Sequence, residues 1–494
     1  MGLRTPDQYL ASLKDGRAVY FQGQPVADVT AHPIIGTACR HAAIDYEMAE
    51  QEQFRDLATV QDPESGRLIS RYYQIPRNPD DLLKRSELIA TSTKLGATLV
   101  CLIKEIGTDA LLGLHMVSQQ VDRELGTSYY PRVRAFYEYC RDNDLALAVA
   151  QTDVKGDRTK GPSDQPNPDY YVHIVEDRPD GIVVRGAKVH TSVSTNANEL
   201  IVLPTRAMGP KDKDYAVAFA IPMNTPGLKL IASPYGAAGA TDKSEFDFPI
   251  SAKHKMMETL TVFDDVFVPK DRVFLKGESQ FAGPYALTFV EFHRFTAISY
   301  KIPLVDLLIG AAQLVAEMNG IERAPHVRDK LTWLIAYAET LKALIRQAAL
   351  DCKYVDGIAV PKTMIVNMAK YHFAHNFHEA YQHVQDLAGG LLVTQPGEAD
   401  LKSPEIGHYV RHYLGGREGV SAEDRLRVIN LISDLTAGEY GGYQEVLAIH
   451  AEGSLEAEKM MVLREYRSTE AKEYARQLAG VAAAQPAPVS VPRS

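Results

Sequence analysis

The chain is organised around residues 150–198, which read AQTDVKGDRTKGPSDQPNPDYYVHIVEDRPDGIVVRGAKVHTSVSTNAN. A polar loop rich in Gly and Pro comes first, short β-type runs of Val and Ile follow, and a second cluster of hydroxyls and amides ends the stretch. Two polar loops joined by short strands make a suitable rim for a large ligand with a polar edge. A surface loop followed by an antiparallel hairpin explains the same pattern without any ligand.

β-type patterns continue on both sides of this stretch, from about residue 146 to residue 283. Strand-like runs separated by Gly, Pro, Asn and Asp are ELIVLPTRAM at 199–208, DYAVAFAIPM at 214–223, GLKLIAS at 227–233 and LTVFDDVFVP at 260–269. Runs at this spacing predict a small barrel or sandwich rather than alternating β/α units.

The flanking regions are helical by periodicity. Residues 1–145 contain a predicted hairpin at 19–30 and helical patterns at 38–54, 80–107 and 108–125. Residues 284–480 contain helical patterns at 304–322, 326–351, 362–387 and 423–439, which suit an up-and-down bundle. The Ala/Pro/Ser-rich tail 481–494 is predicted to be disordered. The fold class predicted is α+β, mainly α, with helical, β and helical-bundle domains in that order.

Composition excludes several classes of protein. A chain of 494 residues is too long for one compact core, and its net charge of −10 argues against nucleic-acid binding. The four cysteines are far apart and form no CxxC pair, so we expect reduced thiols in a cytoplasmic protein. We found no signal peptide and no apolar run of the roughly 20 residues that a membrane span requires. The Rossmann and P-loop phosphate motifs are also missing.

Several histidines and glycines are candidates whose spacing leaves alternatives open. His372, His375, His378 and His383 crowd one predicted helix without the HExxH spacing of zinc hydrolases, so the helix faces solvent or a partner, or holds a metal. His115 lies at helical spacing with apolar neighbours and is predicted to be a core or boundary residue. The pairs Gly389–Gly390 and Gly441–Gly442 fit either helix termination or a close approach to a ligand.

The segment FVEFHRFTAISYK at 289–301 carries the candidate catalytic residues. His293 and Tyr300 are seven residues apart, so on a helix they share a face. A histidine titrates near neutral pH and can take a proton from a phenol or an acidic C–H group. A histidine satisfied at a domain junction is the alternative.

Six segments together indicate a known family. They are QTDVKGDR (151–158), DGIVVRGAKVHTS (180–192), KDYAVAFAIPMNTPGLKL (213–230), TVFDDVFVPKDRVFL (261–275), FHR (292–294) and AGGLLVTQPGEAD (388–400). With them, nearly the whole chain resembles the flavoprotein family of 4-hydroxyphenylacetate 3-monooxygenases and 4-hydroxybutyryl-CoA dehydratases. The resemblance implies an acyl-CoA-dehydrogenase-like fold with an N-terminal helical domain, a middle β-barrel and a C-terminal four-helix bundle, a homotetramer, and FAD between barrel and bundle.

The resemblance also implies which residues contact FAD. They are Gln151, Thr152, Asp153, Val154, Lys155, Gly156, Asp157 and Arg158 in the first loop, His190, Thr191 and Ser192 in the second, and Gly390, Leu391, Leu392, Val393 and Thr394 from a neighbouring subunit. Backbone N–H groups and hydroxyls can satisfy a pyrophosphate and a flavin edge, and Lys155 or Arg158 can neutralise charge.

The two branches of the family differ in a [4Fe–4S] cluster, which the dehydratases hold with three cysteines and a histidine. Cys101 and His293 match two of these ligands, but Glu105 and Tyr300 stand at the other two cysteine positions. Because such a cluster is ordinarily held by thiolates, we expect no metal here. The tyrosine expected between the last two ligands is also replaced, by Ala297. TDVKGDR and KDKDYAVAFA are nevertheless closer to the dehydratases.

Other segments favour the monooxygenases, namely IPMNTPGLKLI, FDFPIS and EYGGYQEVLAIHAEGS. In some halophenol hydroxylases of the family a histidine near the His293 position deprotonates the phenol. The Arg-x-Pro-Asp motif of hydroxylases is absent, and Val149 replaces the histidine before the first FAD loop. The phenol site is therefore expected to differ from the standard one.

The function predicted is the oxygenase component of a two-component monooxygenase, in which a separate reductase supplies FADH2 and O2 is the second substrate. The catalytic set is His293, Arg294, Tyr300 and Lys301, with His293 as the base and Arg294 and Lys301 orienting the anion of a small-molecule, phenol-like substrate. The alternatives are a cluster-free CoA-thioester dehydratase or isomerase with His293 as the base, and a flavin-binding homologue without turnover.

Overall fold

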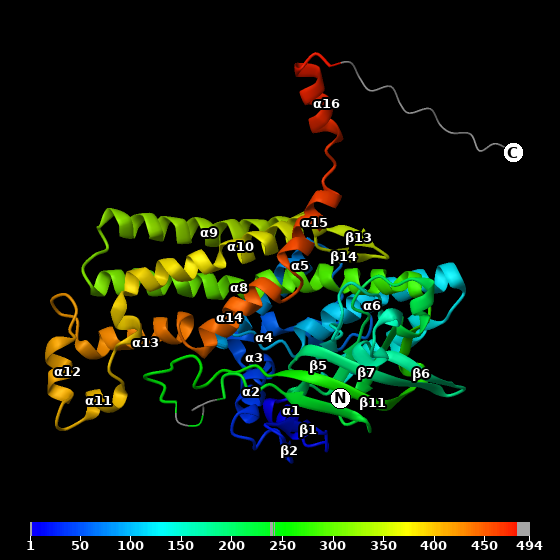
Figure 1. Cartoon of the computed structure of the whole chain (residues 1–494), viewed down its shortest axis with the longest axis horizontal. Coiled ribbons are helices and arrows are strands. Elements are labelled where there is room, and N and C mark those ends of the chain that lie inside the picture. Colours follow the sequence, from blue (N-terminus) through cyan, green and yellow to red (C-terminus); the bar gives the residue numbers. More distant parts are fainter. Residues whose placement is uncertain (1, 238–240, 242, 482–494) are drawn as a thin grey trace.

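The structure is a computed structural model that describes residues 2–237, 241 and 243–481. The predicted disordered tail lies, from residue 482 onward, outside the described residues. Helices and strands follow the predicted order, with helices first, strands in the middle and long helices at the end (Figure 1).

The N-terminal region is mainly helical. Its elements are α1 (Pro6–Ser12), β1 (Val19–Phe21), β2 (Gln24–Val26), α2 (Ile35–Ala42), α3 (Ile44–Glu50), α4 (Glu52–Ala58), β3 (Thr59–Gln61), β4 (Leu68–Ser70), α5 (Pro79–Leu95), α6 (Glu105–Leu125) and α7 (Tyr129–Asp142). The Asn78 side chain caps α5 by accepting from the N–H of Asp81 at 3.0 Å. The continuous helix predicted over 80–107 is wrong, because residues 96–104 form a loop in which Ala97, Thr98 and Leu102 have positive φ.

The middle region contains two sheets rather than one closed barrel among the described residues. Its strands are β5 (Leu147–Ala150), β6 (His173–Arg178), β7 (Gly181–Ser192), β8 (Glu199–Val202), β9 (Val217–Pro222), β10 (Leu228–Ala232), β11 (Glu258–Pro269) and β12 (Val273–Lys276). The larger sheet has the order β2-β1-β10-β11-β7-β6 and the smaller one has the order β12-β9-β8-β5. Their apolar faces share one core cluster with the N-terminal helices.

The predicted hairpin at the N-terminus is confirmed, and it belongs to the larger sheet. Gln22 and Gly23 connect β1 to β2 and both have positive φ, as a tight two-residue turn requires. β1 then pairs with β10 in parallel, Val19 opposite Leu230. The first 30 residues therefore complete a sheet whose other strands come from the middle of the chain.

Long helices dominate the C-terminal region, and α8, α9 and α10 run side by side (Figure 1). The elements are α8 (Ala282–Met318), α9 (Pro325–Leu350), β13 (Lys353–Val355), β14 (Ile358–Val360), α10 (Thr363–Ala388), α11 (Glu398–Lys402), α12 (Gly407–Tyr413), α13 (Ala422–Thr436), α14 (Glu439–His450), α15 (Leu455–Glu465) and α16 (Thr469–Leu478). The 289–301 segment and the helix predicted at 304–322 form one helix, α8, which continues through Pro303.

One stretch of this region differs from the expectation about membrane spans. Residues 279–318 are long and apolar enough to cross a membrane by length and composition. Core helices of soluble proteins meet the same criterion, and half of the most apolar window is buried inside the protein. The helix packs against α5, α6, α9 and α10, so its apolar surface has partners within the chain.

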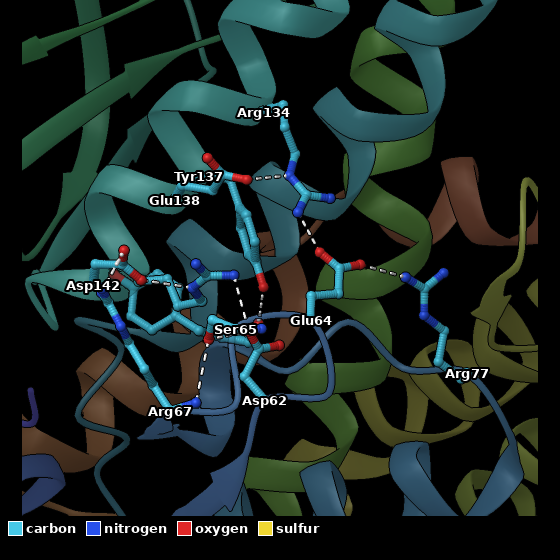
Figure 2. A network of polar contacts seen from close by, with 11 residues as sticks. Asp62, Glu64, Ser65, Arg67, Arg77, Arg134, Tyr137, Glu138 and Asp142 are labelled. Carbon is cyan, nitrogen blue, oxygen red and sulfur yellow. Dashed lines mark hydrogen bonds and ion pairs between the residues drawn. The ribbon is translucent and has the colours of Figure 1, made fainter.

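A network of ion pairs joins the β3–β4 hairpin to α7 (Figure 2). Arg141 contacts Asp62 at 3.1 Å and Arg67 contacts Asp142 at 2.9 Å. Glu64 lies between Arg134 and Arg77, the latter at 3.3 Å. These contacts hold the hairpin loop against one face of the helix.

Candidate functional site

A cleft of about 550 Å³ lies between the larger sheet and α14. Its walls come from the ends of β7, β10 and β11, from the first half of α14, from Leu99, and from residues 233–236, 243, 251 and 254–256. Polar groups in the wall include His190, His254 and Glu258, and apolar ones include Ile231 and Val446. An apolar cleft with few polar groups is the usual form of a small-molecule site.

The predicted loop 151–158 borders the sheet, and Asp153 anchors it. The buried Asp153 carboxylate contacts Lys188 Nζ at 2.8 Å and accepts from the N–H of Val172 at 3.0 Å. Burial lowers the pKa of Lys188, and the carboxylate opposes this shift. Asp153 therefore stabilises the conformation of the loop, because Lys188 already neutralises its charge.

The rest of the loop offers backbone and cationic groups. Thr152 O accepts from the N–H of Val189 at 2.9 Å, and Gln151 Nε2 donates to Ala286 O at 3.2 Å. Lys155 and Gly156 have positive φ, and a Cβ on Gly156 would lie 2.3 Å from the Tyr170 ring. Burial lowers the pKa of Lys155, and Arg158 lowers it further. Asp157 and Arg158 are exposed.

Of the second predicted set, at the end of β7, only His190 reaches the cleft. His190 lines it with a positive φ. The Thr191 hydroxyl is buried and has no hydrogen-bond partner within the described residues. Ser192 Oγ donates to the Glu258 carboxylate at 2.9 Å. Thr191 is fully buried and, unlike His190, does not itself line the cleft.

The third predicted set lies apart from the first two within one chain. Residues 390–394 begin with a 3₁₀ turn, η8 (Gly390–Val393), after α10, and it packs against α10 and α13. This end of α10 is on the opposite side of the molecule from β5 and β7 (Figure 1). Leu392 is buried in the bundle core, Leu391 is half-buried, and Gly390, Val393 and Thr394 are exposed. A role of these residues in FAD binding therefore requires a second subunit.

Three of the four predicted catalytic residues converge on Glu452, which the sequence analysis did not single out. The Tyr300 hydroxyl donates to Glu452 Oε1, and Lys301 Nζ lies 3.0 Å from Oε2. Arg294 Nε donates to the Glu452 backbone O at 2.9 Å. Glu452 follows α14 with a positive φ. Glu452 belongs to the segment EYGGYQEVLAIHAEGS, which carries part of the family resemblance, but no spacing pattern in that segment indicates a functional carboxylate.

A second lysine completes this buried cluster. Lys370 Nζ lies 3.4 Å from Glu452 Oε2 and donates to Ala448 O at 2.7 Å. Burial alone would raise the pKa of Glu452, but Lys301 and Lys370 lower it to about 2. Burial lowers the pKa of Lys301 to about 8 despite the carboxylate. The cluster is therefore a carboxylate held between two ammonium groups.

Gly453 makes room for this cluster. Its φ is +115°, and a Cβ there would lie 2.5 Å from Arg294 Nη2. The same arginine contacts Glu458 at 3.4 Å and donates to Asn367 Oδ1. Arg294 is therefore fixed by α10, α15 and the loop between α14 and α15.

His293 is oriented by a different acid. Its Nδ1 lies 3.1 Å from Asp109 Oδ2, and the other Asp109 oxygen accepts from Arg85 at 2.7 Å. The ring stacks on Phe289 at a centroid distance of 5.0 Å. With Nδ1–H donated to the carboxylate, Nε2 carries the lone pair. His293 is 7% exposed and does not line the cleft.

The other candidate histidines have separate structural partners. His115 is buried, as predicted, with Nδ1 3.0 Å from Leu111 O, and burial lowers its pKa to about 4. On α10, His372 packs on Tyr337 and His383 on Trp333, while His375 and His378 are exposed. Among the described residues, no three His, Cys, Asp or Glu side chains are grouped to hold a metal ion.

The positions that match the cluster ligands of dehydratases do not offer a fitting donor set. The Glu105 carboxylate accepts from the Tyr72 hydroxyl at 3.3 Å and from the Lys104 N–H at 3.1 Å. The Tyr300 hydroxyl is engaged with Glu452. One thiol and one imidazole remain, whereas a cubane cluster needs thiolates at most of its irons.

Comparison with known proteins assigns nearly the whole chain to one family. The family model described as 4-hydroxyphenylacetate 3-hydroxylase N terminal matches residues 5–275, and the C-terminal model of that hydroxylase matches residues 283–480. The chain belongs to the 4-hydroxyphenylacetate 3-hydroxylase family. Its predicted family is thereby confirmed.

The relatives include both branches of the family. A 4-hydroxybutyryl-CoA dehydratase/vinylacetyl-CoA-Δ-isomerase of Clostridium aminobutyricum is 34% identical over 97% of this chain and 100% of its own length. The oxygenase component of a 4-hydroxyphenylacetate 3-monooxygenase of Thermus thermophilus is 29% identical over 90% of each chain.

Solved structures of both kinds share the fold. An oxygen-tolerant archaeal 4-hydroxybutyryl-CoA dehydratase from N. maritimus superposes with a TM-score of 0.91 at 30% identity, covering 98% of this chain and 96% of the other. The oxygenase component of a 4-hydroxyphenylacetate 3-monooxygenase complexed with FAD gives 0.88 at 26% identity, covering 96% and 98%. The predicted acyl-CoA-dehydrogenase-like fold class is confirmed, with the middle region built as two sheets.

Proposed function

We propose that this chain binds FAD and is the oxygenase component of a two-component monooxygenase that hydroxylates a phenolic substrate with O2. A separate reductase would supply FADH2, and the oxygenase would work as a homotetramer. The observation that carries the proposal is the replacement of two cluster thiolates by Glu105 and Tyr300, whose oxygens are already hydrogen-bonded. Without those thiolates the chain lacks the ligands for an iron–sulfur cluster, which favours a reaction that uses flavin alone.

The two predicted loops carry groups that fit FAD. The unpartnered Thr191 hydroxyl and the backbone groups of residues 151–158 offer hydrogen bonds to a flavin and its pyrophosphate. Lys155 and Arg158 offer positive charge for the phosphates. FADH2, once bound, would supply the electrons that activate O2.

His293 would take the phenol proton. Asp109 accepts from Nδ1–H, so Nε2 is the basic atom, and the fixed carboxylate stabilises the imidazolium that forms. Burial lowers the pKa of Lys301 to about 8. The protonated Lys301, paired with Glu452, would place a positive charge near the substrate anion. Arg294 positions the backbone of Glu452, and Tyr300 positions its carboxylate.

A cluster-free dehydratase or isomerase acting on a CoA thioester is the second candidate. It is favoured by the relative that is 34% identical over its full length, against 29% for the Thermus monooxygenase component. The same residues would then serve a different reaction, with His293 removing a proton from carbon.

Turnover separates the candidates. The full chain would be mixed with photoreduced FAD, O2 and a panel of phenols including 4-hydroxyphenylacetate, and both oxygen use and hydroxylated product would be measured. We expect phenol-dependent product, and we expect His293→Ala to lower its rate by about 100-fold, as loss of a general base does. His326→Ala, an exposed histidine at the start of α9, is the matched control.

Three other results would each contradict the proposal. Anaerobic turnover of 4-hydroxybutyryl-CoA or vinylacetyl-CoA would support the thioester enzyme. Tight FAD binding without substrate-dependent oxygen use would indicate a flavin-binding homologue. An unchanged hydroxylation rate in His293→Ala would remove the assigned base.

A further inference from the structure

A second cavity, of about 560 Å³, lies at the other end of β7 from the first cleft. Its walls come from the first turn of α7 and the residues just before it, from the β6–β7 turn with the strand ends beside it, and from Lys270, Val273 and Lys276. Gly181 lines this cavity and His190 lines the first cleft. A rise of about 3.3 Å per residue puts these two positions about 30 Å apart along the strand. The second cavity is therefore separate from the first cleft.

Positive charge dominates the walls of the second cavity. Its basic side chains are Arg132, Arg178, Lys270 and Lys276, and its one acidic side chain is Asp177. The whole chain carries a net charge of −10, so the excess of cations is a local feature. Like charges on the walls of a concave surface focus their field into it and concentrate ions of the opposite sign. The cavity therefore favours an anionic ligand.

Two of the four cations have no carboxylate partner in the part of the chain that the structure describes. The Lys270 side chain is exposed, and only its backbone N–H has a partner, Asp180 O at 2.8 Å. Arg132 is half-buried, donates to Val273 O at 3.1 Å and lies over the Tyr129 ring, with 5.3 Å between its Cζ and the ring centroid. These contacts hold Arg132 in place without neutralising its charge.

The other two cations have weakly bound partners. Lys276 contacts Asp177 at 2.9 Å, and Arg178 contacts Glu176 at 2.7 Å. The four side chains are between 42% and 60% exposed, so water screens both pairs. A ligand with several negative charges can compete for these cations.

The carboxylates behind the cavity are hydrogen-bonded to other groups. Glu278 accepts from the Tyr129 hydroxyl and from the Lys276 N–H, both at 2.9 Å. Asp122 accepts from the N–H groups of Tyr129 and Tyr130 at 2.8 Å. Asp122 thus occupies the N-terminus of α7, and the cationic side chains are the groups that a ligand can reach.

Size and charge together indicate the class of ligand. Small-molecule sites have volumes of about 300–1,000 Å³, so this cavity has room for a ligand of nucleotide size. The planar guanidinium of Arg132 can donate two parallel hydrogen bonds to phosphate oxygens, and Lys270 adds a point charge. Pro179 and Ile182 give apolar contacts for the organic part of the ligand.

We propose that the second cavity binds an organic pyrophosphate of nucleotide size, such as a nucleoside diphosphate, with Arg132 and Lys270 contacting the phosphate oxygens. Arg178 and Lys276 add positive charge at the rim. The site is separate from the first cleft and from the two predicted FAD loops, so the nucleotide binds while flavin and substrate are in place. The proposal does not rest on the proposed function.

Calorimetric titration of the full chain in excess FAD tests the assignment, with ADP, pyrophosphate and adenosine as probes. We expect ADP and pyrophosphate to bind once per chain and adenosine not to bind, because the phosphates carry the recognition. Arg132→Gln and Lys270→Gln should each weaken ADP binding by about tenfold, as the loss of one hydrogen bond from a charged group does.

The matched controls are Arg328→Gln on α9 and Lys84→Gln on α5. Both side chains are exposed, and neither forms an ion pair among the residues that the structure describes. Arg132→Lys keeps the charge but loses the planar fork, so it should weaken ADP binding less than Arg132→Gln does. Lys270→Gln removes no contact within the chain, so its result decides the assignment even if the Arg132 variants do not fold.

Several results would overturn the proposal. They are no binding of ADP or pyrophosphate, adenosine binding as tightly as ADP, or unchanged ADP affinity in Lys270→Gln. Release of FAD by ADP would mean that the nucleotide occupies the flavin site. Coenzyme A binding at least tenfold more tightly than ADP would make the cavity part of a thioester site. Failure of phenol hydroxylation with the ADP results intact would contradict only the proposed function.

Discussion

At the scale of single residues, Glu258 carries the most readily measured pH signature. It lies at the start of β11, half-buried at the cleft, and accepts from Ser192 Oγ at 2.9 Å and from the Tyr443 hydroxyl at 2.7 Å. Burial raises its pKa to about 7, and these hydrogen bonds oppose the shift only in part. The folded protein therefore binds this proton more tightly than the unfolded chain does.

The stability of the fold should depend on that proton. Because the folded pKa is raised, the stabilisation is fully present below the unfolded value of about 4.3 and is lost as the pH rises through 7. We expect the free energy of unfolding of the wild type to fall between pH 5 and pH 8 relative to Glu258→Gln, measured by urea denaturation. Exposed Glu339→Gln on α9 is the control, and the same pH dependence in Glu258→Gln as in wild type would contradict the assignment.

The buried cluster around Glu452 could not be predicted from residue types alone. Arg294, Tyr300 and Lys301 were predicted from one segment, but the residue that all three contact, Glu452, lies 151 residues beyond Lys301 in the sequence. Its carboxylate is 2% exposed and lies between two lysines, an arrangement that only packing produces. No periodicity connects positions so far apart.

At the scale of elements, the contacts between the β3–β4 hairpin and α7 differ in burial. The Arg141–Asp62 pair has side chains 5% and 8% exposed, whereas Glu64 is 38% exposed between Arg134 and Arg77 (Figure 2). Removing Asp62 takes a buried charged hydrogen bond from Arg141, which then keeps only Asp142, at 2.8 Å, whereas an exposed pair is screened by water.

Two variants of this network should therefore differ in stability. We expect Asp62→Asn to lower the free energy of unfolding by about 3 kcal/mol, and Glu64→Gln to lower it by less than about 1 kcal/mol. Chemical denaturation at neutral pH measures both. Equal losses would mean that burial does not rank these contacts.

Another element, the loop at residues 96–104, explains a failed prediction. Its sequence has helical periodicity, but three residues with positive φ interrupt the helix and direct Val100 O toward His41. Local preference is overridden here by the contacts that the loop makes with α2. The departure from local pattern lies beside the cleft, which Leu99 of this loop lines, as is common at functional sites.

At the scale of the whole molecule, the N-terminal hairpin and the middle strands are interdependent. β1 covers the edge of β10, and the buried Arg17 side chain donates to Thr195 O and Ala197 O at 3.1 and 2.6 Å. An uncovered strand edge exposes unpaired backbone groups and promotes association. The middle region is thus not independent of the first 30 residues.

Truncation tests this dependence. We expect residues 146–283 expressed alone, and the chain lacking residues 1–30, to aggregate or to lose cooperative unfolding, as judged by size-exclusion chromatography and thermal melting. Arg17→Met in the full chain should fold with a lower Tm, because it leaves two buried carbonyls without donors. A monodisperse, cooperatively folding 146–283 fragment would contradict the interpretation.

The amino-acid sequence by itself determined the type and order of most elements and the family. These features are local or are carried by long runs of similar residues, so periodicity and motifs suffice to predict them. Tertiary structure alone decided that β1 pairs with β10, that Glu452 contacts three predicted catalytic residues, and that His41 contacts His254. Each of these is a contact between distant segments, and such contacts depend on how whole elements pack rather than on neighbouring residues.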